Sequence, residues 1–184
     1  MKLFSWLRGD TRAHDTLAGW RQAWQRAIDT PTDGDLVALR RELEESTPPD
    51  GDVEVELEML EALEQLRQFQ QQAASGTLPV IETQHRMVAA EACHFSAPAS
   101  AADEQAQTSG RVLITPTRIV FVGAGRTQVT AWHAVRDVAR LARDVAFVGA
   151  DRSVAAQFRF NTFGDAVVTA FLGAHFRDAR RPRL

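Results

Sequence analysis

The spacing of the hydrophobic residues changes near residue 79 of this 184-residue chain. Before that point, apolar residues recur at intervals of three and four over about 11–28, 33–45 and 52–74, which is the period of an amphipathic α-helix. Beyond it, apolar residues alternate with polar ones or form short runs, as they do in β-strands. The pattern predicts three helices followed by an antiparallel sheet.

The three predicted helices are separated by two breaks that contain proline and glycine. Asp10 or Thr11 is the expected N-cap of the first helix, and Thr32 or Asp33 that of the second. The third helix carries an apolar seam of Val53, Leu57, Leu60, Leu63 and Leu66. Its glutamates are expected to line the outside: Glu54, Glu56, Glu58, Glu61 and Glu64. Because the seam spans only about two heptads, we expect a helical hairpin or a three-helix layer rather than a coiled coil.

The strongest strand signal is the stretch 110–123, GRVLITPTRIVFVG. Two apolar runs flank residues 115–118, where Pro116 presets the backbone angle of a turn. This pattern predicts a tight β-hairpin. Both faces of the hairpin are apolar, which is typical of a strand pair inside a barrel or sandwich.

Strand patterns also occur on both sides of this hairpin. The stretch 84–95 predicts one long bent strand or two short ones, and the small and polar residues of 96–109 predict a loop. Further strands are expected at 127–132, 145–148 and 154–161, with apolar positions at 135, 138 and 141 between the first two. Thr162 and Asp165 have the spacing of a capping box and precede one amphipathic helix.

The sequence of the hairpin, with Gly110, Arg111, Thr115, Arg118 and Phe121 around its apolar runs, resembles that of the PH-like (pleckstrin homology-like) domain of the GRAM or bacterial PH type. The series of strands closed by one C-terminal helix is similar to that family as well. The resemblance covers roughly residues 80–176. It implies an α+β protein, in which an N-terminal helical segment precedes a PH-like antiparallel β-barrel or sandwich capped by one C-terminal α-helix.

The expected parts are an acidic helical segment at 1–79, the PH-like β domain at 80–176 and a basic tail at 177–184. The family resemblance implies a binding module without chemistry of its own. PH-like domains that bind phosphoinositides resemble one another in a basic loop after the first strand. In this chain the corresponding loop, 96–109, contains only Asp103 and Glu104 as charges, which disfavours headgroup binding by that route.

The charge of the chain is divided between its two parts. Residues 1–79 contain eight basic and fifteen acidic side chains, whereas residues 80–184 contain thirteen basic and nine acidic ones. The second part is thus mildly basic and can face an anionic partner. No apolar run is long enough to span a bilayer, and the N-terminus lacks the pattern of a secretory signal, so we expect a cytoplasmic location.

Candidate catalytic and metal-binding residues are few. The best metal set is His85, Cys93, His94 and His133, but its spacing is not that of a zinc site. Cys93 and His94 are adjacent, so on a strand they point to opposite faces and form a poor nucleophile–base pair. We therefore expect no metal, no cofactor and no enzymatic activity, and we expect Cys93 to be a small buried apolar group.

Four arginines of the β part are the candidate binding residues: Arg111, Arg118, Arg126 and Arg159. The function predicted from the sequence is a cytoplasmic adaptor that recognises a protein or peptide. One alternative is a peripheral membrane protein at the inner face of an anionic membrane, with Phe4 and Trp6 as membrane contacts. Another is a small-ligand carrier or enzyme with a pocket in the barrel mouth. Nucleic acid is not expected as a partner, because exposed aromatic residues are not interleaved with the basic ones. The sequence leaves the oligomeric state open.

Overall fold

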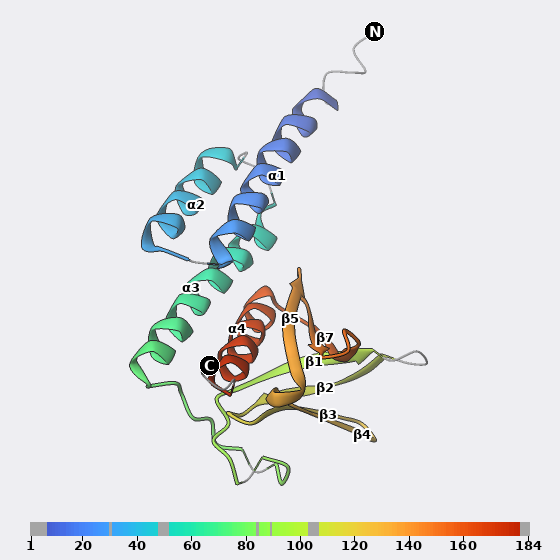
Figure 1. Cartoon of the computed structure of the whole chain (residues 1–184). Coiled ribbons are helices and arrows are strands. Elements are labelled where there is room, and N and C mark those ends of the chain that lie inside the picture. Colours follow the sequence, from blue (N-terminus) through green and yellow to red (C-terminus); the bar gives the residue numbers. More distant parts are fainter. Residues whose placement is uncertain are drawn as a thin grey trace. The chain divides into compact units, whose positions relative to one another are not determined.

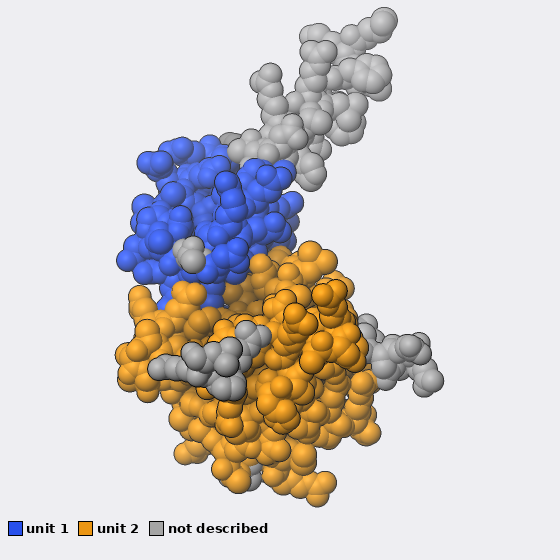
Figure 2. Space-filling model, in the orientation of Figure 1, with its two compact units in different colours: residues 1–68 blue, residues 69–184 orange. Residues whose placement is uncertain are grey.

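The computed structural model describes residues 7–29, 31–47, 52–83, 85–88, 90–102 and 107–180. Three helices come first along the chain, then seven strands, and one further helix ends the described part (Figure 1). The chain forms two compact units, 1–68 and 69–184 (Figure 2). Their boundary falls within the third helix.

The first unit is built from α1 (Leu7–Asp29), α2 (Asp33–Ser46) and the larger part of α3 (Glu54–Ser75). The two tryptophans of α1 are fully buried in it. The indole N–H of Trp20 donates to the carbonyl oxygen of Leu39 at 2.7 Å, and that of Trp24 donates to the carbonyl oxygen of Met59 at 2.5 Å. The two tryptophans therefore join α1 to both other helices and belong to the core.

The cap predicted for α2 is confirmed, but that of α1 is not. The Thr32 hydroxyl accepts a bond from the Asp35 N–H at 3.2 Å, and the Asp35 carboxylate accepts one from the Thr32 N–H at 3.0 Å. This reciprocal pair is a capping box with aspartate in the third position. By contrast, α1 already begins at Leu7, before the predicted caps Asp10 and Thr11.

The predicted seam of α3 is confirmed at Leu60, Leu63 and Leu66, which are buried, but not near the start of the helix. Glu56, expected outside, is 1% exposed and forms an ion pair with Arg21 of α1 at 2.5 Å. Leu57, expected inside, is 49% exposed. The physical reason is the position of α1: its arginine neutralises a carboxylate that would otherwise be too costly to bury.

The second unit contains one antiparallel sheet of seven strands (Figure 1). The strands are β1 (Phe95–Ala102), β2 (Gln107–Ile114), β3 (Arg118–Gly123), β4 (Arg126–Ala131), β5 (Val135–Leu141), β6 (Asp144–Gly149) and β7 (Val154–Phe160). Their order in the sheet is β4-β3-β2-β1-β7-β6-β5, so the sheet is open, with β4 and β5 at its edges. The closing helix α4 (Phe163–Ala179) packs on β5, β6 and β7. The predicted fold class, α+β with a β unit capped by a C-terminal helix, is confirmed.

The predicted hairpin is present as β2 and β3, with Ile114 opposite Ile119. Its inner face contributes Val112 and Phe121 to the main core, and its outer face is covered as well, by a smaller cluster that contains Leu113, Val120, Val88 and Cys93. An apolar hairpin with both faces covered is what the sequence pattern indicated. The capping residue of α4 is also confirmed, because the Thr162 hydroxyl accepts a bond from the Asp165 N–H at 3.0 Å.

Two predictions before the hairpin are wrong. The expected loop 96–109 consists largely of β1 and β2, which pair from Phe95 opposite Ile114 to Ala102 opposite Gln107. Alternate residues of β1, namely Ala97, Ala99 and Ala101, are buried in the main core, where large neighbouring side chains fill the space. The strand or strands expected at 84–95 are also absent from the described residues there, apart from Phe95 at the start of β1: the segment contains turns, and Cys93 forms a single bridge with Ile81.

Candidate functional site

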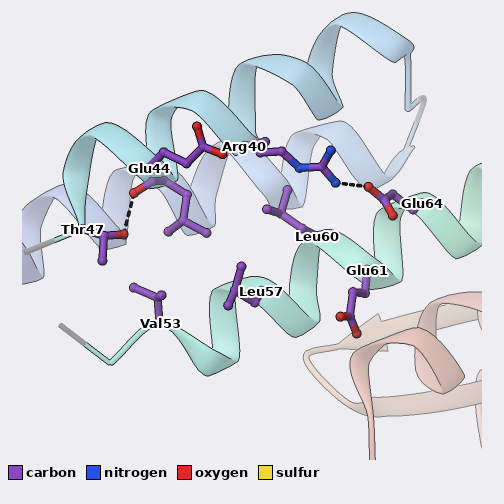
Figure 3. Close-up of a pocket in the computed structure, with 9 residues that line it drawn as sticks. Arg40, Glu44, Thr47, Val53, Leu57, Leu60, Glu61 and Glu64 are labelled. Atoms are coloured by element: carbon purple, nitrogen blue, oxygen red, sulfur yellow. Dashed lines mark hydrogen bonds and ion pairs between the residues drawn. The ribbon is translucent and has the colours of Figure 1, made fainter. Parts of the chain in front are cut away.

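A groove of about 480 Å³ lies between α2 and α3 in the first unit (Figure 3). Its apolar lining consists of Leu43, Val53, Leu57 and Leu60. Leu43 and Leu60 are almost fully buried and form the floor, whereas Leu57 is half exposed. Figure 3 shows Leu57 and Leu60 projecting from α3 toward α2. The groove therefore offers apolar surface that the unit itself leaves partly uncovered.

The rim of the groove is acidic. Its charged residues are Glu44 and Arg40 of α2 and Glu61 and Glu64 of α3. Arg40 forms an ion pair with Glu64 that links the two helices (Figure 3). Three carboxylates against one guanidinium leave the rim negative, so it attracts cations.

The chemistry of the groove is that of a binding surface. All nine lining residues belong to the described part of the chain, and none of them is histidine, cysteine, serine or lysine. The single hydroxyl, that of Thr47, donates to the carbonyl oxygen of Leu43 at 2.5 Å. The volume lies within the range of about 300–1,000 Å³ that is usual for binding pockets. Such a groove can hold apolar side chains flanked by cations.

The four arginines predicted as binding residues do not share one face of the sheet. Arg111 is exposed on β2, and its Nη1 donates to the Ser96 hydroxyl at 3.1 Å. Arg159 is exposed on β7 and lies 4.0 Å from a carboxylate oxygen of Asp144. Both point away from the core, because they alternate with buried neighbours. Arg126 lies on the opposite face, where its Nη2 donates to the amide oxygen of Gln128 at 3.3 Å.

Arg118, the fourth predicted residue, forms an ion pair with Glu91. The same carboxylate accepts bonds from the hydroxyls of Thr115, at 2.7 Å, and Thr117. Burial raises the pKa of Glu91, but the hydrogen bonds from Thr117 and Thr115 and the charge of Arg118 lower it more, so that the pKa lies below its ordinary value. Glu91 thus connects the segment before β1 to the β2–β3 turn. The sequence pattern gave no signal for it, because it lies 24 residues before Thr115.

Replacing Glu91 with glutamine is expected to lower the free energy of unfolding by about 1–2 kcal/mol at neutral pH, because the ion pair with Arg118 is lost. Since the folded-state pKa of Glu91 is depressed, its carboxylate stabilises the fold above the ordinary pKa of 4.5 and loses this effect as the pH falls through the folded-state pKa. Urea unfolding of both proteins at pH values from neutral to acid measures the difference, which should shrink toward low pH. Glu82→Gln, an exposed change nearby, is the control. A pH-independent difference for Glu91→Gln would contradict the role of its charge.

The remaining predicted residues are distributed as follows. Phe4 and Trp6 lie outside the described residues. Cys93 is buried, as predicted, and burial raises the pKa of its thiol. Within the described part of the chain, no three histidine, cysteine, aspartate or glutamate side chains gather as metal ligands would. None of the helices described is long and apolar enough to cross a membrane.

No family model and no curated protein matches this chain. Similar solved structures include the C-terminal domain of an unknown protein from Leishmania infantum, with 14% identity over 49% of this chain and 88% of that one and a TM-score of 0.41. Inner Membrane Complex Sub-compartment Protein 3 from Toxoplasma gondii is 14% identical over 47% and 77% of the two chains, with a TM-score of 0.39. The linker-DH/PH domains of p115-RhoGEF are 12% identical over 87% and 56%, with a TM-score of 0.43.

The TM-scores of these neighbours are too low for any functional argument. The fold is therefore described from the strand order and the closing helix of this structure. By these features the chain is an α+β protein in which helices precede an antiparallel β unit closed by one C-terminal helix.

Proposed function

We propose that this chain is a non-enzymatic cytoplasmic adaptor, in which a PH-like unit of the GRAM or bacterial PH type is joined to a helical unit that docks a protein partner. The observation that carries the proposal is the groove between α2 and α3, with its apolar floor and acidic rim. The occupant that fits both properties is a basic amphipathic helix of the partner.

The apolar part of the groove sets the shape of this occupant. An amphipathic helix presents apolar side chains at intervals of three and four residues and can lay them into a groove between two helices. Leu57, half exposed in the free protein, would become buried on binding. Complete burial of an exposed leucine side chain contributes about 1.5–3 kcal/mol, so covering the exposed half of Leu57 contributes about 1 kcal/mol to the affinity.

The acidic rim of the groove determines the charge of the partner. Glu44 and Glu61 flank the apolar lining from the two helices (Figure 3). Lysine and arginine side chains on a partner helix would pair with them and speed association at low salt. The same carboxylates repel an anionic lipid surface, so the groove favours a protein partner over a membrane.

The test measures binding of a fluorescent synthetic peptide to the full-length protein by anisotropy. The peptide has leucines at helical spacing and lysines on its other face, and a matched peptide carries glutamate in place of lysine. We expect the lysine peptide to bind and the glutamate peptide to fail. Leu57→Asp should weaken binding by about tenfold or more. Val37→Asp is the matched control, since Val37 is 69% exposed on α2 and does not line the groove.

Equal binding of the two peptides would contradict the role of the acidic rim. An equal loss of affinity in Leu57→Asp and Val37→Asp would show that the groove is not the site. Analytical ultracentrifugation of the free protein over a concentration series tests whether a second copy of the chain occupies the groove. A dimer that dissociates in the Leu57→Asp variant would assign the groove to that second copy instead of a partner protein.

A further inference from the structure

A second cavity, of about 350 Å³, lies within the β unit. It is formed where the short helix η1 (Trp132–Ala134) and the start of β5 meet the last turn of α4. Trp132 and Val135 provide its apolar floor. The titratable lining residues are His133, Arg136, Arg177 and Arg180, and no carboxylate lines the cavity.

Arg177 is the fixed member of this cationic set. Its Nε donates to Asp178 at 2.8 Å, and its Nη1 donates to Asp137 at 3.3 Å and to the carbonyl oxygen of Arg136 at 3.4 Å. The side chain is only 13% exposed, so it is held in one position between α4 and β5. The hydrogen bond that Arg177 donates to Asp178 raises the pKa of Arg177, with a further contribution from Asp137.

The charged residues that line the cavity are all positive. Asp137 and Asp178, which pair with Arg177, are 72% and 54% exposed and lie outside the lining. Arg136, on β5, and Arg180, at the end of α4, are both exposed. Three arginines and no carboxylate therefore line one cavity.

We propose that this cavity binds an acidic peptide segment, with a carboxylate between the arginines and an adjacent apolar side chain on the floor of Trp132 and Val135. Guanidinium groups recognise carboxylates through paired, charge-assisted hydrogen bonds. The inference goes beyond the groove of the helical unit, because it concerns a different unit and a partner of opposite charge.

The shape of the site favours a peptide over a nucleic acid or a membrane. A nucleic acid backbone requires cations spaced along a stripe, and an anionic membrane requires an exposed basic face. Here the cations surround a single cavity with an apolar floor, and its volume lies at the lower end of the range for binding pockets, about 300–1,000 Å³. This volume suits one or two side chains of a peptide.

The experiment uses the full-length protein and a fluorescein-labelled peptide that combines glutamates with leucines, compared with a peptide in which glutamine replaces every glutamate. We expect the glutamate peptide alone to bind. Arg136→Glu and Arg180→Glu, tested singly, should each weaken binding by about tenfold or more, because each replaces an attractive charge with a repulsive one. Arg140→Glu is the matched control: it makes the same charge change on β5, outside the lining.

Equal binding of the glutamate and glutamine peptides would overturn the proposal, as would an Arg140→Glu loss as large as that of Arg136→Glu and Arg180→Glu. Binding of the protein to vesicles that contain phosphatidylserine is measured as well. If the vesicles bind through Arg136 and Arg180 and the peptide does not bind, the site belongs to a membrane surface and the proposal is wrong. Because the groove is probed with a lysine peptide and Leu57→Asp, failure of either proposal is distinguishable from failure of the other.

Discussion

Replacing Gly110 with alanine is expected to lower the free energy of unfolding of the β unit by about 3 kcal/mol. A Cβ atom at this position would lie 2.2 Å from the carbonyl oxygen of Val122 and 2.7 Å from the Cα of Gly123. Both atoms belong to the backbone of β3, which is paired with β2 at this point. The third close atom, in the ring of Phe121 at 2.7 Å, belongs to a fully buried side chain. None of the three can move aside without breaking the strand pairing or the core.

The same substitution at Gly19 is the matched control. Gly19 lies in α1, and an added Cβ would meet no atom within 4 Å. Because glycine is a poor helix former, Gly19→Ala is expected to stabilise the protein by about 0.5–1 kcal/mol. Urea unfolding followed by circular dichroism measures both changes. A Gly110→Ala protein as stable as the unchanged chain would show that β2 and β3 do not approach as closely as the structure has them.

Replacing Trp132 with alanine is expected to lower the free energy of unfolding by about 3–5 kcal/mol. The indole ring is fully buried, with its centroid 5.7 Å from that of Phe147 of β6 and 6.5 Å from that of Phe176 of α4. Its N–H donates to the carbonyl oxygen of Thr115 at 2.8 Å. The side chain therefore joins the sheet, the closing helix and the β2–β3 turn, and its removal leaves a large cavity.

Trp132→Phe separates the hydrogen bond from the packing. It keeps an aromatic ring but leaves the Thr115 carbonyl oxygen without its donor, so a smaller loss of about 1–3 kcal/mol is expected. Leu141→Ala, on the edge strand β5 and 76% exposed, should change stability by no more than about 0.5 kcal/mol. Equilibrium unfolding in urea measures the free energy of unfolding of all three variants. A Trp132→Ala protein no less stable than Leu141→Ala would contradict the position of Trp132 in the core.

The helices and most of the buried face of α3 could be predicted from local spacing, but the burial of Glu56 could not. Helical periodicity shows that one face is buried, and leucines normally mark that face. In α3 the burial of Glu56 depends on Arg21, which lies 35 residues earlier in the chain. A pairing of this kind leaves no trace in the local pattern, so Glu56 was expected outside and Leu57 inside.

The strands were predictable where their residues have strong β preferences. The hairpin of β2 and β3 and the alternating strand β7 consist largely of β-branched, aromatic and other apolar residues at buried positions. Strand β1, with the sequence FSAPASAA, has few such residues and was expected to be a loop. It becomes a strand because β2 and β7 pair with it on both sides, and alanines fit where the core is already filled.

The amino-acid sequence alone determined the helices, the β2–β3 hairpin and strand β7, the turns and caps at Pro116, Thr32 and Thr162, and the acidic and basic character of the two parts. These properties depend on residues close together in the chain. The tertiary structure decided which side chains meet: Glu56 with Arg21, Glu91 with Arg118, and the arginines of β5 with those of α4. Both candidate binding sites are of this second kind, because a groove or cavity forms only where separate elements pack together.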